Sequence, residues 1–115
     1  MEKLNKSLNE YILENLKVGE MVDDCIDFKF DIKVIGIEGK ICKNGSFSVT
    51  IEVLGIKIGS FNIDLSKGEW CQKLDVKIEE GKICFYLKDA CLYTKGYVDG
   101  WLHKKEEWDC KIVCF

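Results

Sequence analysis

The sequence predicts a mainly β protein, an antiparallel meander of about eight strands curled into a small barrel or wrapped sheet, with one N-terminal α-helix. From residue 27 onward, apolar and polar residues alternate with a period of two, which is typical of strands with one wet face. Short stretches rich in glycine or charge separate these segments, as hairpin turns do. The 115 residues include no proline, a residue that central strands exclude.

The N-terminal helix is predicted over residues 3–17. Gly19 follows it where a C-terminal cap belongs, and charged residues cover much of the remaining surface. A helix of this length is marginal alone in water, so its apolar face must pack against the rest of the protein. That face recurs at helical spacing and consists of Leu4, Leu8, Tyr11, Ile12 and Leu16.

The sheet is predicted over residues 27–115. The apolar members of each strand share one face, because successive side chains in a strand point to opposite sides. The clearest alternating segments are 28–34, 47–53, 61–65, 70–78, 83–87 and 108–114.

Hairpin turns can be placed by matching the faces of the strands on either side, because a slip of one residue inverts every face. A two-residue loop at Glu80-Gly81 matches the faces and sets Leu74 opposite Leu87. A three-residue loop ending at Gly45 sets Ile41 opposite Phe47. The complete set of predicted turns is Lys43 to Gly45, Lys67-Gly68, Glu80-Gly81, Lys88-Asp89 and Lys104-Lys105.

One phrase occurs twice in the sequence. An alternating segment at Asp31 leads into Glu38-Gly39-Lys40-Ile41-Cys42, and a similar segment at Asp75 leads into Glu80-Gly81-Lys82-Ile83-Cys84. We interpret each copy as a strand, a glycine turn and a second strand. Two copies do not make a solenoid, so the phrase describes hairpins and carries no function of its own.

A chain of 115 residues is long enough for one domain, and we treat 1–115 as a single unit. The apolar face of a twisted sheet must be buried, either by closure around itself or against a second layer. A curled sheet or small barrel is the first prediction, and a two-layer β-sandwich is the alternative.

The composition argues against several classes of protein. The net charge is −3 and arginine is absent, whereas a nucleic-acid binder usually presents a basic face with arginine forks. No apolar run approaches the ~18–20 residues that a membrane-spanning helix requires. His103 is the only histidine, and no metal-ligand or cofactor motif is present. We therefore predict no catalytic residues, no metal site and no cofactor.

Seven cysteines are a high content for this length. No Cys-x-x-Cys pair occurs, so neither a zinc knuckle nor a thioredoxin-like motif is indicated. In the predicted registers no two cysteines lie opposite each other on adjacent strands, and any bridges would have to be long-range. Cys42, Cys71 and Cys84 fall on the wet face, whereas Cys110 and Cys114 fall on the apolar face.

The redox state of these cysteines stays open between a disulfide framework and reduced structural thiols. An odd number leaves at least one thiol free or paired with another chain. The candidates for a disulfide or a free thiol are Cys25, Cys42, Cys71, Cys84, Cys91, Cys110 and Cys114.

Aromatic residues gather in the second half of the chain. The alternation fails near Gly96 and Gly100, and amphipathic rings beside an irregular segment are typical of sugar and small-ligand sites. Cross-strand packing of the same rings is the structural alternative. The predicted ligand-binding residues are Tyr93, Tyr97, Trp101, His103 and Trp108.

The sequence thus favours a non-enzymatic, barrel-like binding module for a small apolar or saccharide ligand. One alternative is a secreted or self-associating structural protein stabilised by disulfides, with edge strands forming a homo-oligomer. The other is a small barrel isomerase or cyclase that uses His103 or a buried carboxylate as a base. Met1 fits either the start of a cytoplasmic protein or the added first residue of a trimmed secreted domain, so both localisations stay open.

Overall fold

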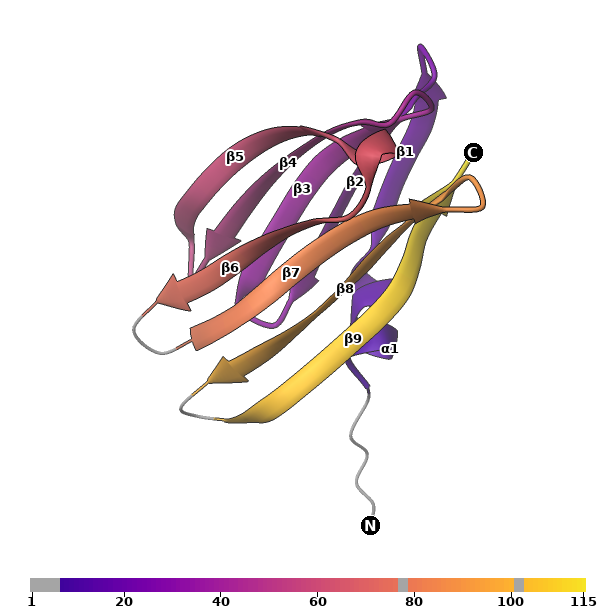
Figure 1. Cartoon of the computed structure of the whole chain (residues 1–115). Coiled ribbons are helices and arrows are strands. Elements are labelled where there is room, and N and C mark those ends of the chain that lie inside the picture. Colours follow the sequence, from indigo (N-terminus) through magenta and orange to yellow (C-terminus); the bar gives the residue numbers. More distant parts are fainter. Residues whose placement is uncertain (1–6, 77–78, 101–102) are drawn as a thin grey trace.

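A computed structural model describes residues 7–76, 79–100 and 103–115 of the chain. They form one α-helix, a short 3-10 helix (η1) and nine strands (Figure 1). The elements are α1 (Leu8–Asn15), β1 (Lys17–Val22), β2 (Cys25–Ile32), β3 (Ile35–Cys42), β4 (Ser46–Val53), β5 (Ile56–Asp64), η1 (Leu65–Lys67), β6 (Trp70–Val76), β7 (Glu79–Lys88), β8 (Cys91–Gly100) and β9 (His103–Cys114).

The strands form two antiparallel sheets, so the prediction of a mainly β fold with an N-terminal helix is confirmed. Strands β1 to β5 make a five-stranded sheet in chain order, and β6 to β9 make a four-stranded sheet. The sheets do not join into a closed barrel; they lie as two layers wrapped around a common core (Figure 1). The arrangement is therefore the wrapped or two-layer form of the prediction.

The chain passes from one sheet to the other at η1. The prediction of a hairpin at Lys67-Gly68 is wrong, because β5 and β6 belong to different sheets and do not pair. Asp64 caps η1 through a hydrogen bond from the Ser66 N–H, 3.0 Å long. The Gly68 N–H then donates to the Leu65 carbonyl, and the chain turns into the second layer.

Helix α1 closes one side of the two layers. Ser7 and Glu10 form a reciprocal capping box at its start, and Leu8 and Ile12 are buried in the common core. The helix ends at Asn15, earlier than predicted, because the chain enters β1 at Lys17 and pairs with β2 there. Residues 3–6 of the predicted helix lie outside the described residues.

Strand β1 was not expected from the sequence, and Gly19 lies within it rather than capping the helix. All six residues of β1 are exposed, so no burial pattern with a period of two marks the strand. Its pairing with β2 also shifts between Val18 and Met21. An edge strand of this kind is held by its backbone pairing more than by side-chain burial.

The register of the β3–β4 hairpin is the predicted one, with Ile41 opposite Phe47 and a glycine at positive φ in the turn. The β6–β7 register differs, because Leu74 lies opposite Gly81 and not Leu87. The displacement is an even number of residues and leaves every side chain on its predicted face. Face matching therefore could not detect the error.

The last two hairpins differ from the prediction as well. The β7–β8 turn is at Asp89-Ala90 rather than at Lys88-Asp89, and Leu92 lies opposite Leu87. The prediction of a turn at Lys104-Lys105 is wrong, because both lysines belong to β9. Strand β8 instead ends at Gly100, which pairs with the first residue of β9.

The glycines of the repeated phrase are strand residues and not turn residues. Gly39 lies in β3 opposite Phe28 and Val49. A Cβ atom placed there would lie 2.8 Å from Cζ of Phe28 and 2.5 Å from the Ser48 carbonyl oxygen. Only glycine allows the Phe28 ring and the Ser48 backbone to approach this closely. In the first copy the turn residue at positive φ is Lys33.

Aromatic rings fill the centre of the core. Phe47 and Phe85, from opposite sheets, have ring centroids 4.8 Å apart, and Phe61 and Trp70 have centroids 5.1 Å apart. Phe28 stacks on both Phe30 and Phe47. These side chains occupy the space between the layers where an apolar ligand of a barrel would lie.

Three disulfides join cysteines that lie directly opposite on adjacent strands, so the prediction of long-range bridges is wrong. The pairs are Cys25–Cys42 in β2–β3, Cys71–Cys84 in β6–β7 and Cys91–Cys114 in β8–β9. The even displacement of the β6–β7 register had hidden the second pair.

The exposure of two cysteines differs from the prediction. Cys84 is 2% exposed although it lies on the polar side of β7, where its partner Cys71 adjoins it. Cys114 is exposed rather than apolar-facing, because the β8–β9 register shifts between Leu92 and Tyr93. Cys110 is the free cysteine and is buried, in agreement with its predicted face.

Candidate functional site

The structure separates the predicted ligand-binding residues. Tyr93 and Tyr97 are half-buried on β8 and lie on the outer face of the four-stranded sheet, with Lys95 between them. Trp108 is 4% exposed and belongs to the core; its Nε1 donates to Thr94 Oγ1 at 3.2 Å. Trp101 lies outside the described residues. His103 begins β9, and its side chain is also outside them.

The outer face of the four-stranded sheet carries an aromatic and charged cluster that the sequence analysis did not include in full. Tyr86 lies opposite Tyr93, and their rings stack with centroids 5.1 Å apart. Lys95 Nζ is 5.3 Å from the Tyr86 ring centroid and 2.7 Å from Glu69 Oε1. The ion pair with Glu69 raises the pKa of Lys95.

The hydroxyl of Tyr86 donates to Asp109 Oδ1 at 2.8 Å. Loss of solvent, together with this hydrogen bond and the adjacent carboxylate charge, raises the pKa of Tyr86 to about 12. Because Tyr93 and Lys95 lie against the Tyr86 ring, and Lys105 Nζ is 4.5 Å from the Tyr97 ring centroid, neighbouring side chains already occupy aromatic faces. The cluster therefore fits cross-strand packing better than an open stacking platform.

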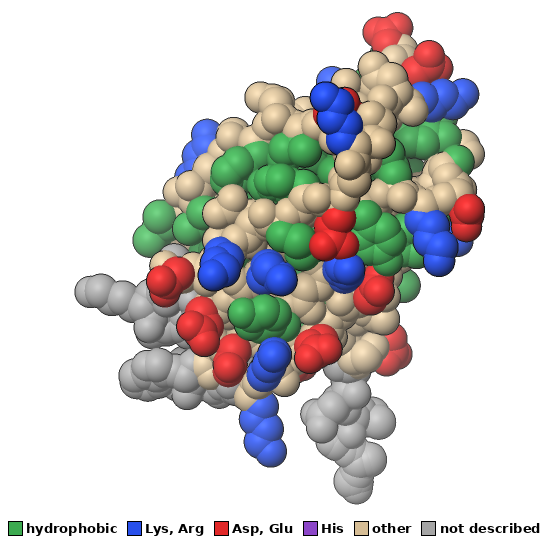
Figure 2. Space-filling model, viewed as in Figure 1, with side chains coloured by type: hydrophobic (Ala, Val, Ile, Leu, Met, Phe, Trp, Pro, Cys, Tyr) green, Lys and Arg blue, Asp and Glu red, His purple; other side chains and the backbone are tan. Residues whose placement is uncertain are grey.

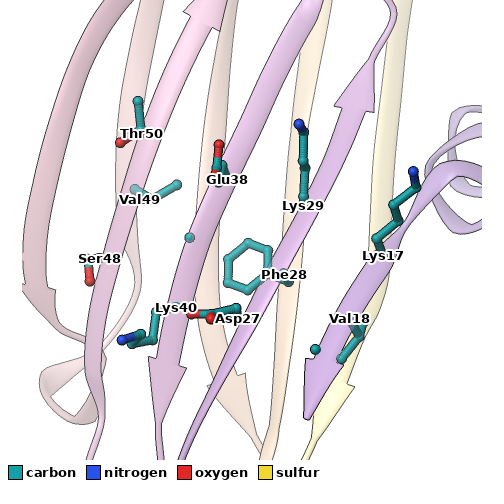
Figure 3. A pocket seen from close by; sticks show the side chains of 12 residues that line it. Lys17, Val18, Asp27, Phe28, Lys29, Glu38, Lys40, Ser48, Val49 and Thr50 are labelled. Carbon is teal, nitrogen blue, oxygen red and sulfur yellow. The ribbon is translucent and has the colours of Figure 1, made fainter. Parts of the chain in front are cut away.

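A larger hollow of about 630 Å³ lies on the outer face of the five-stranded sheet (Figure 3). It crosses β1 to β4 and is open to solvent. The backbone around Phe28, Gly39 and Val49 forms its floor. The side chains of Phe28 and Val49 are buried in the core, and Gly39 has none. The polar side chains that line it are Lys17, Asp27, Lys29, Glu38, Lys40, Ser48 and Thr50.

The charges in this hollow, which we call the sheet hollow, are set by the β2–β3 register. Asp27 lies directly opposite Lys40, and Lys29 lies directly opposite Glu38. Figure 3 shows the first pair together at one end of the hollow and the second pair further along the same strands. Opposite charges on facing residues of adjacent strands attract each other. Donors and acceptors therefore alternate across the hollow.

Hydroxyl groups extend the hollow on β4, and a third lysine closes it on β1. Ser48 lies opposite Lys40, and Thr50 lies opposite Glu38. The Thr50 hydroxyl is also 2.9 Å from the Ser60 hydroxyl on β5. Lys17 lies opposite Lys29. The hollow thus offers ammonium donors, carboxylate acceptors and hydroxyls on one rigid surface.

A disulfide holds the hairpin that supplies these charges. Cys25 and Cys42 face each other in β2–β3, and Asp27 and Lys40 are the next pair on the same face. Alternation had placed these charged residues on the wet face. It could not distinguish a hollow from an evenly solvated surface, because the hollow depends on how the strands curve.

The four-stranded sheet also brings a carboxylate to the second disulfide. Cys71 Sγ lies 3.4 Å from Glu69 Oε2, and Glu69, Cys71 and Cys84 could present ligand atoms within 4.8 Å of one another. With the two sulfurs bonded to each other, no thiolate is offered to a metal ion. The remaining thiol, Cys110, is inert as well, because burial and the adjacent Asp109 charge raise its pKa to about 11.

Comparison of the chain with protein-family models, with curated proteins and with solved structures gives no significant match. Within the described residues, no helix has both the length and the apolar character needed to span a membrane.

Proposed function

We propose that the chain is a non-enzymatic recognition domain of an oxidising compartment, and that its sheet hollow binds a hydroxyl-rich ligand of the saccharide class. The observation that carries the proposal is the facing pairs Asp27–Lys40 and Lys29–Glu38 on a hairpin closed by Cys25–Cys42. They give a wide polar surface that is fixed before any ligand arrives.

The disulfides support the assignment to an oxidising compartment. Six of the seven cysteines are bonded in three cross-strand pairs. Such bonds form and persist in secreted proteins and in oxidising compartments, and they are rare in a reducing cytosol. This favours the disulfide-stabilised alternative of the sequence analysis over a cytoplasmic protein with seven thiols.

The lining of the sheet hollow supports the ligand class. A saccharide presents many hydroxyls that each donate and accept, and the hollow offers carboxylate acceptors beside ammonium and hydroxyl donors. Charged groups make stronger hydrogen bonds than neutral ones. The seven polar side chains of the lining favour a hydroxyl-rich ligand over a wholly apolar one, and aromatic side chains fill the core between the sheets.

The rigidity of the sheet hollow supports a binding role. Side chains on paired strands are held more firmly than side chains on loops, and a preformed surface loses less entropy when a ligand binds. The disulfide keeps β2 and β3 in register, so the four charges retain their spacing. The isomerase alternative named His103 as one candidate base, and the side chain of His103 lies outside the described residues.

The test is a binding screen with immobilised neutral and acidic oligosaccharides, followed by titration calorimetry with any that bind. We expect Lys29→Gln and Glu38→Gln each to weaken binding about tenfold or more, as loss of a charge-assisted hydrogen bond does. Glu52→Gln is the matched control, because Glu52 is exposed on β4 outside the hollow, and it should bind normally.

Two outcomes would overturn the proposal. The first is the absence of binding to every oligosaccharide at millimolar concentration. The second is binding that survives both substitutions in the hollow but is lost in Tyr93→Ala, which would place the ligand on the outer face of the four-stranded sheet, beside the Tyr86–Tyr93 pair.

A further inference from the structure

The two open sides of the layered fold differ in what packs against them. On one side α1 packs against β2 and β9, where Asn9 Oδ1 accepts the N–H of Asp109 on β9 and the Asn15 amide bonds to Asp31 on β2. On the other side β5 is the last strand of its sheet. Among the described residues, no strand pairs with the outer edge of β5.

Apolar side chains follow this uncovered edge. Ile56 is 67% exposed, and Ile58, Phe61 and Ile63 are half-buried. Figure 2 shows hydrophobic side chains gathered between β5 and β6, on the face turned to the viewer. A free strand edge with an apolar border is the usual template for pairing with another strand.

We propose that β5 pairs with β5 of a second copy of this chain, antiparallel and about a two-fold axis at Ser60. The two five-stranded sheets would then become one continuous ten-stranded sheet across the dimer. This inference concerns the partner of the protein and is independent of the ligand in the sheet hollow.

The faces of β5 are known from its pairing with β4. The core-facing residues are opposite buried residues of β4 and comprise Ile56, Gly59, Phe61 and Ile63. The solvent-facing residues comprise Lys57, Ser60, Asn62 and Asp64. The register shifts between Ile51 and Glu52 of β4, which leaves Ile58 as an extra residue. The dimer register has to match these faces, because a slip of one residue would oppose apolar and polar side chains.

With the two-fold axis at Ser60, core-facing residues lie opposite core-facing residues along the whole strand. The extra residue Ile58 is left without a partner in this register. Phe61 faces Gly59 of the second copy, on the core side of the sheet; within each copy the Phe61 ring lies over its own Gly59. Ile56, the most exposed of these apolar side chains, faces Ile63 of the second copy. The axis repeats each contact twice, so the exposed apolar border covers itself.

The charged residues of β5 favour a second copy of this chain over an unrelated strand as its pairing partner. Lys57 lies opposite Asn62 of the second copy and diagonal to its Asp64, within reach of a long side chain. A lysine and a bulge on an edge strand normally disfavour pairing with unrelated strands. A second copy provides the carboxylate that compensates the lysine, and it does so on both sides of the axis.

The first experiment measures mass against concentration by analytical ultracentrifugation of the oxidised protein. We expect a reversible dimer whose dissociation constant rises about tenfold or more in Ile56→Glu, because a charge replaces a buried side chain at two symmetric places. Leu54→Glu is the matched control: Leu54 is 50% exposed in the preceding turn and lies outside the interface.

The second experiment tests the register. A cysteine at the axis meets its own copy, so Ser60→Cys should form an intermolecular disulfide on mild oxidation. Asn62→Cys, on the same face of the same strand, should not cross-link efficiently. A protein that stays monomeric at millimolar concentration would overturn the proposal, as would a dimer unaffected by Ile56→Glu. Equal cross-linking at both positions would overturn the axis.

Discussion

The side-chain amide of Asn15 pairs with both backbone groups of Asp31. Asn15 Nδ2 donates to the Asp31 carbonyl oxygen at 3.0 Å, and the Asp31 N–H donates to Asn15 Oδ1 at 2.6 Å. Asp31 lies beyond the part of β2 that β1 covers, so the amide takes the place of a neighbouring strand. One residue at the end of α1 thus completes the edge of the five-stranded sheet.

We predict that Asn15→Ala lowers the free energy of unfolding by about 1–3 kcal/mol, because it leaves two backbone groups without their partner. The measurement is chemical denaturation followed by circular dichroism. Leu13→Ala is the control, since Leu13 is 50% exposed on the same helix and should change stability little. Equal losses in the two variants would refute the bridging role of Asn15.

Two glycines of β3 should respond oppositely to alanine. A Cβ at Gly39 would lie 2.5 Å from the Ser48 carbonyl oxygen, whereas at Gly36 its nearest neighbour is 3.5 Å away. We predict that Gly39→Ala destabilises the protein by about 1–3 kcal/mol through overpacking. Gly36→Ala should be neutral or stabilising, because glycine weakens a strand interior. Thermal unfolding of the two variants tests this contrast, which a tolerated Gly39→Ala would disprove.

The pKa of Tyr86, raised to about 12, predicts a loss of stability in alkali. Between the ordinary tyrosine pKa of about 10 and this value, the unfolded chain loses the Tyr86 proton while the folded chain keeps it. The stabilisation is therefore complete below about pH 10 and falls as the pH rises toward 12. We expect Tyr86→Phe to flatten this part of the stability curve.

Tyrosinate absorbance during alkaline titration measures the same effect in the folded state. Asp109→Asn removes the carboxylate charge that opposes ionisation, so the pKa of Tyr86 should move down toward its ordinary value. Tyr93→Phe serves as the comparison variant, since it retains the Tyr86–Asp109 hydrogen bond. An unchanged titration curve in Asp109→Asn would show that the carboxylate does not hold the proton.

Removal of the first disulfide should affect both stability and the sheet hollow. We predict that Cys25→Ala with Cys42→Ala costs about 2–4 kcal/mol in the free energy of unfolding. It should also weaken ligand binding, because the facing charges lie on the hairpin that the bond closes. Cys71→Ala with Cys84→Ala should have a comparable cost in stability and no effect on binding. If both double variants lost binding equally, the dependence of the sheet hollow on the Cys25–Cys42 bond would be refuted.

The fold class follows from the sequence because alternation reports directly on burial. Phe28, Phe30 and Ile32 are each buried as their pattern predicts, and the Ile41–Phe47 pair fixes one register correctly. Alternation repeats every two residues, so it cannot separate registers that differ by an even number. This limitation explains why Leu74 was assigned to the wrong partner and why the Cys71–Cys84 pair was not recognised.

The turns and the site were less predictable. Glycine suggested turns at Gly39 and Gly81, whereas the structure uses glycine for close packing within strands and places residues such as Asp24, Lys33 and Ala90 at positive φ. The sheet hollow arises from the curvature of strands whose sequence shows only wet positions. The aromatic candidates were chosen by composition, which does not reveal that Tyr93 and Trp108 belong to opposite faces.

The central claim is that three cross-strand disulfides hold the hairpins of a recognition domain. Disulfide mapping of the native, unreduced protein by proteolysis and mass spectrometry tests it most directly. We predict the linkages Cys25–Cys42, Cys71–Cys84 and Cys91–Cys114, with Cys110 as the single thiol that reacts once the protein is denatured without reductant. Seven reactive thiols, or bridges between non-adjacent strands, would contradict this account.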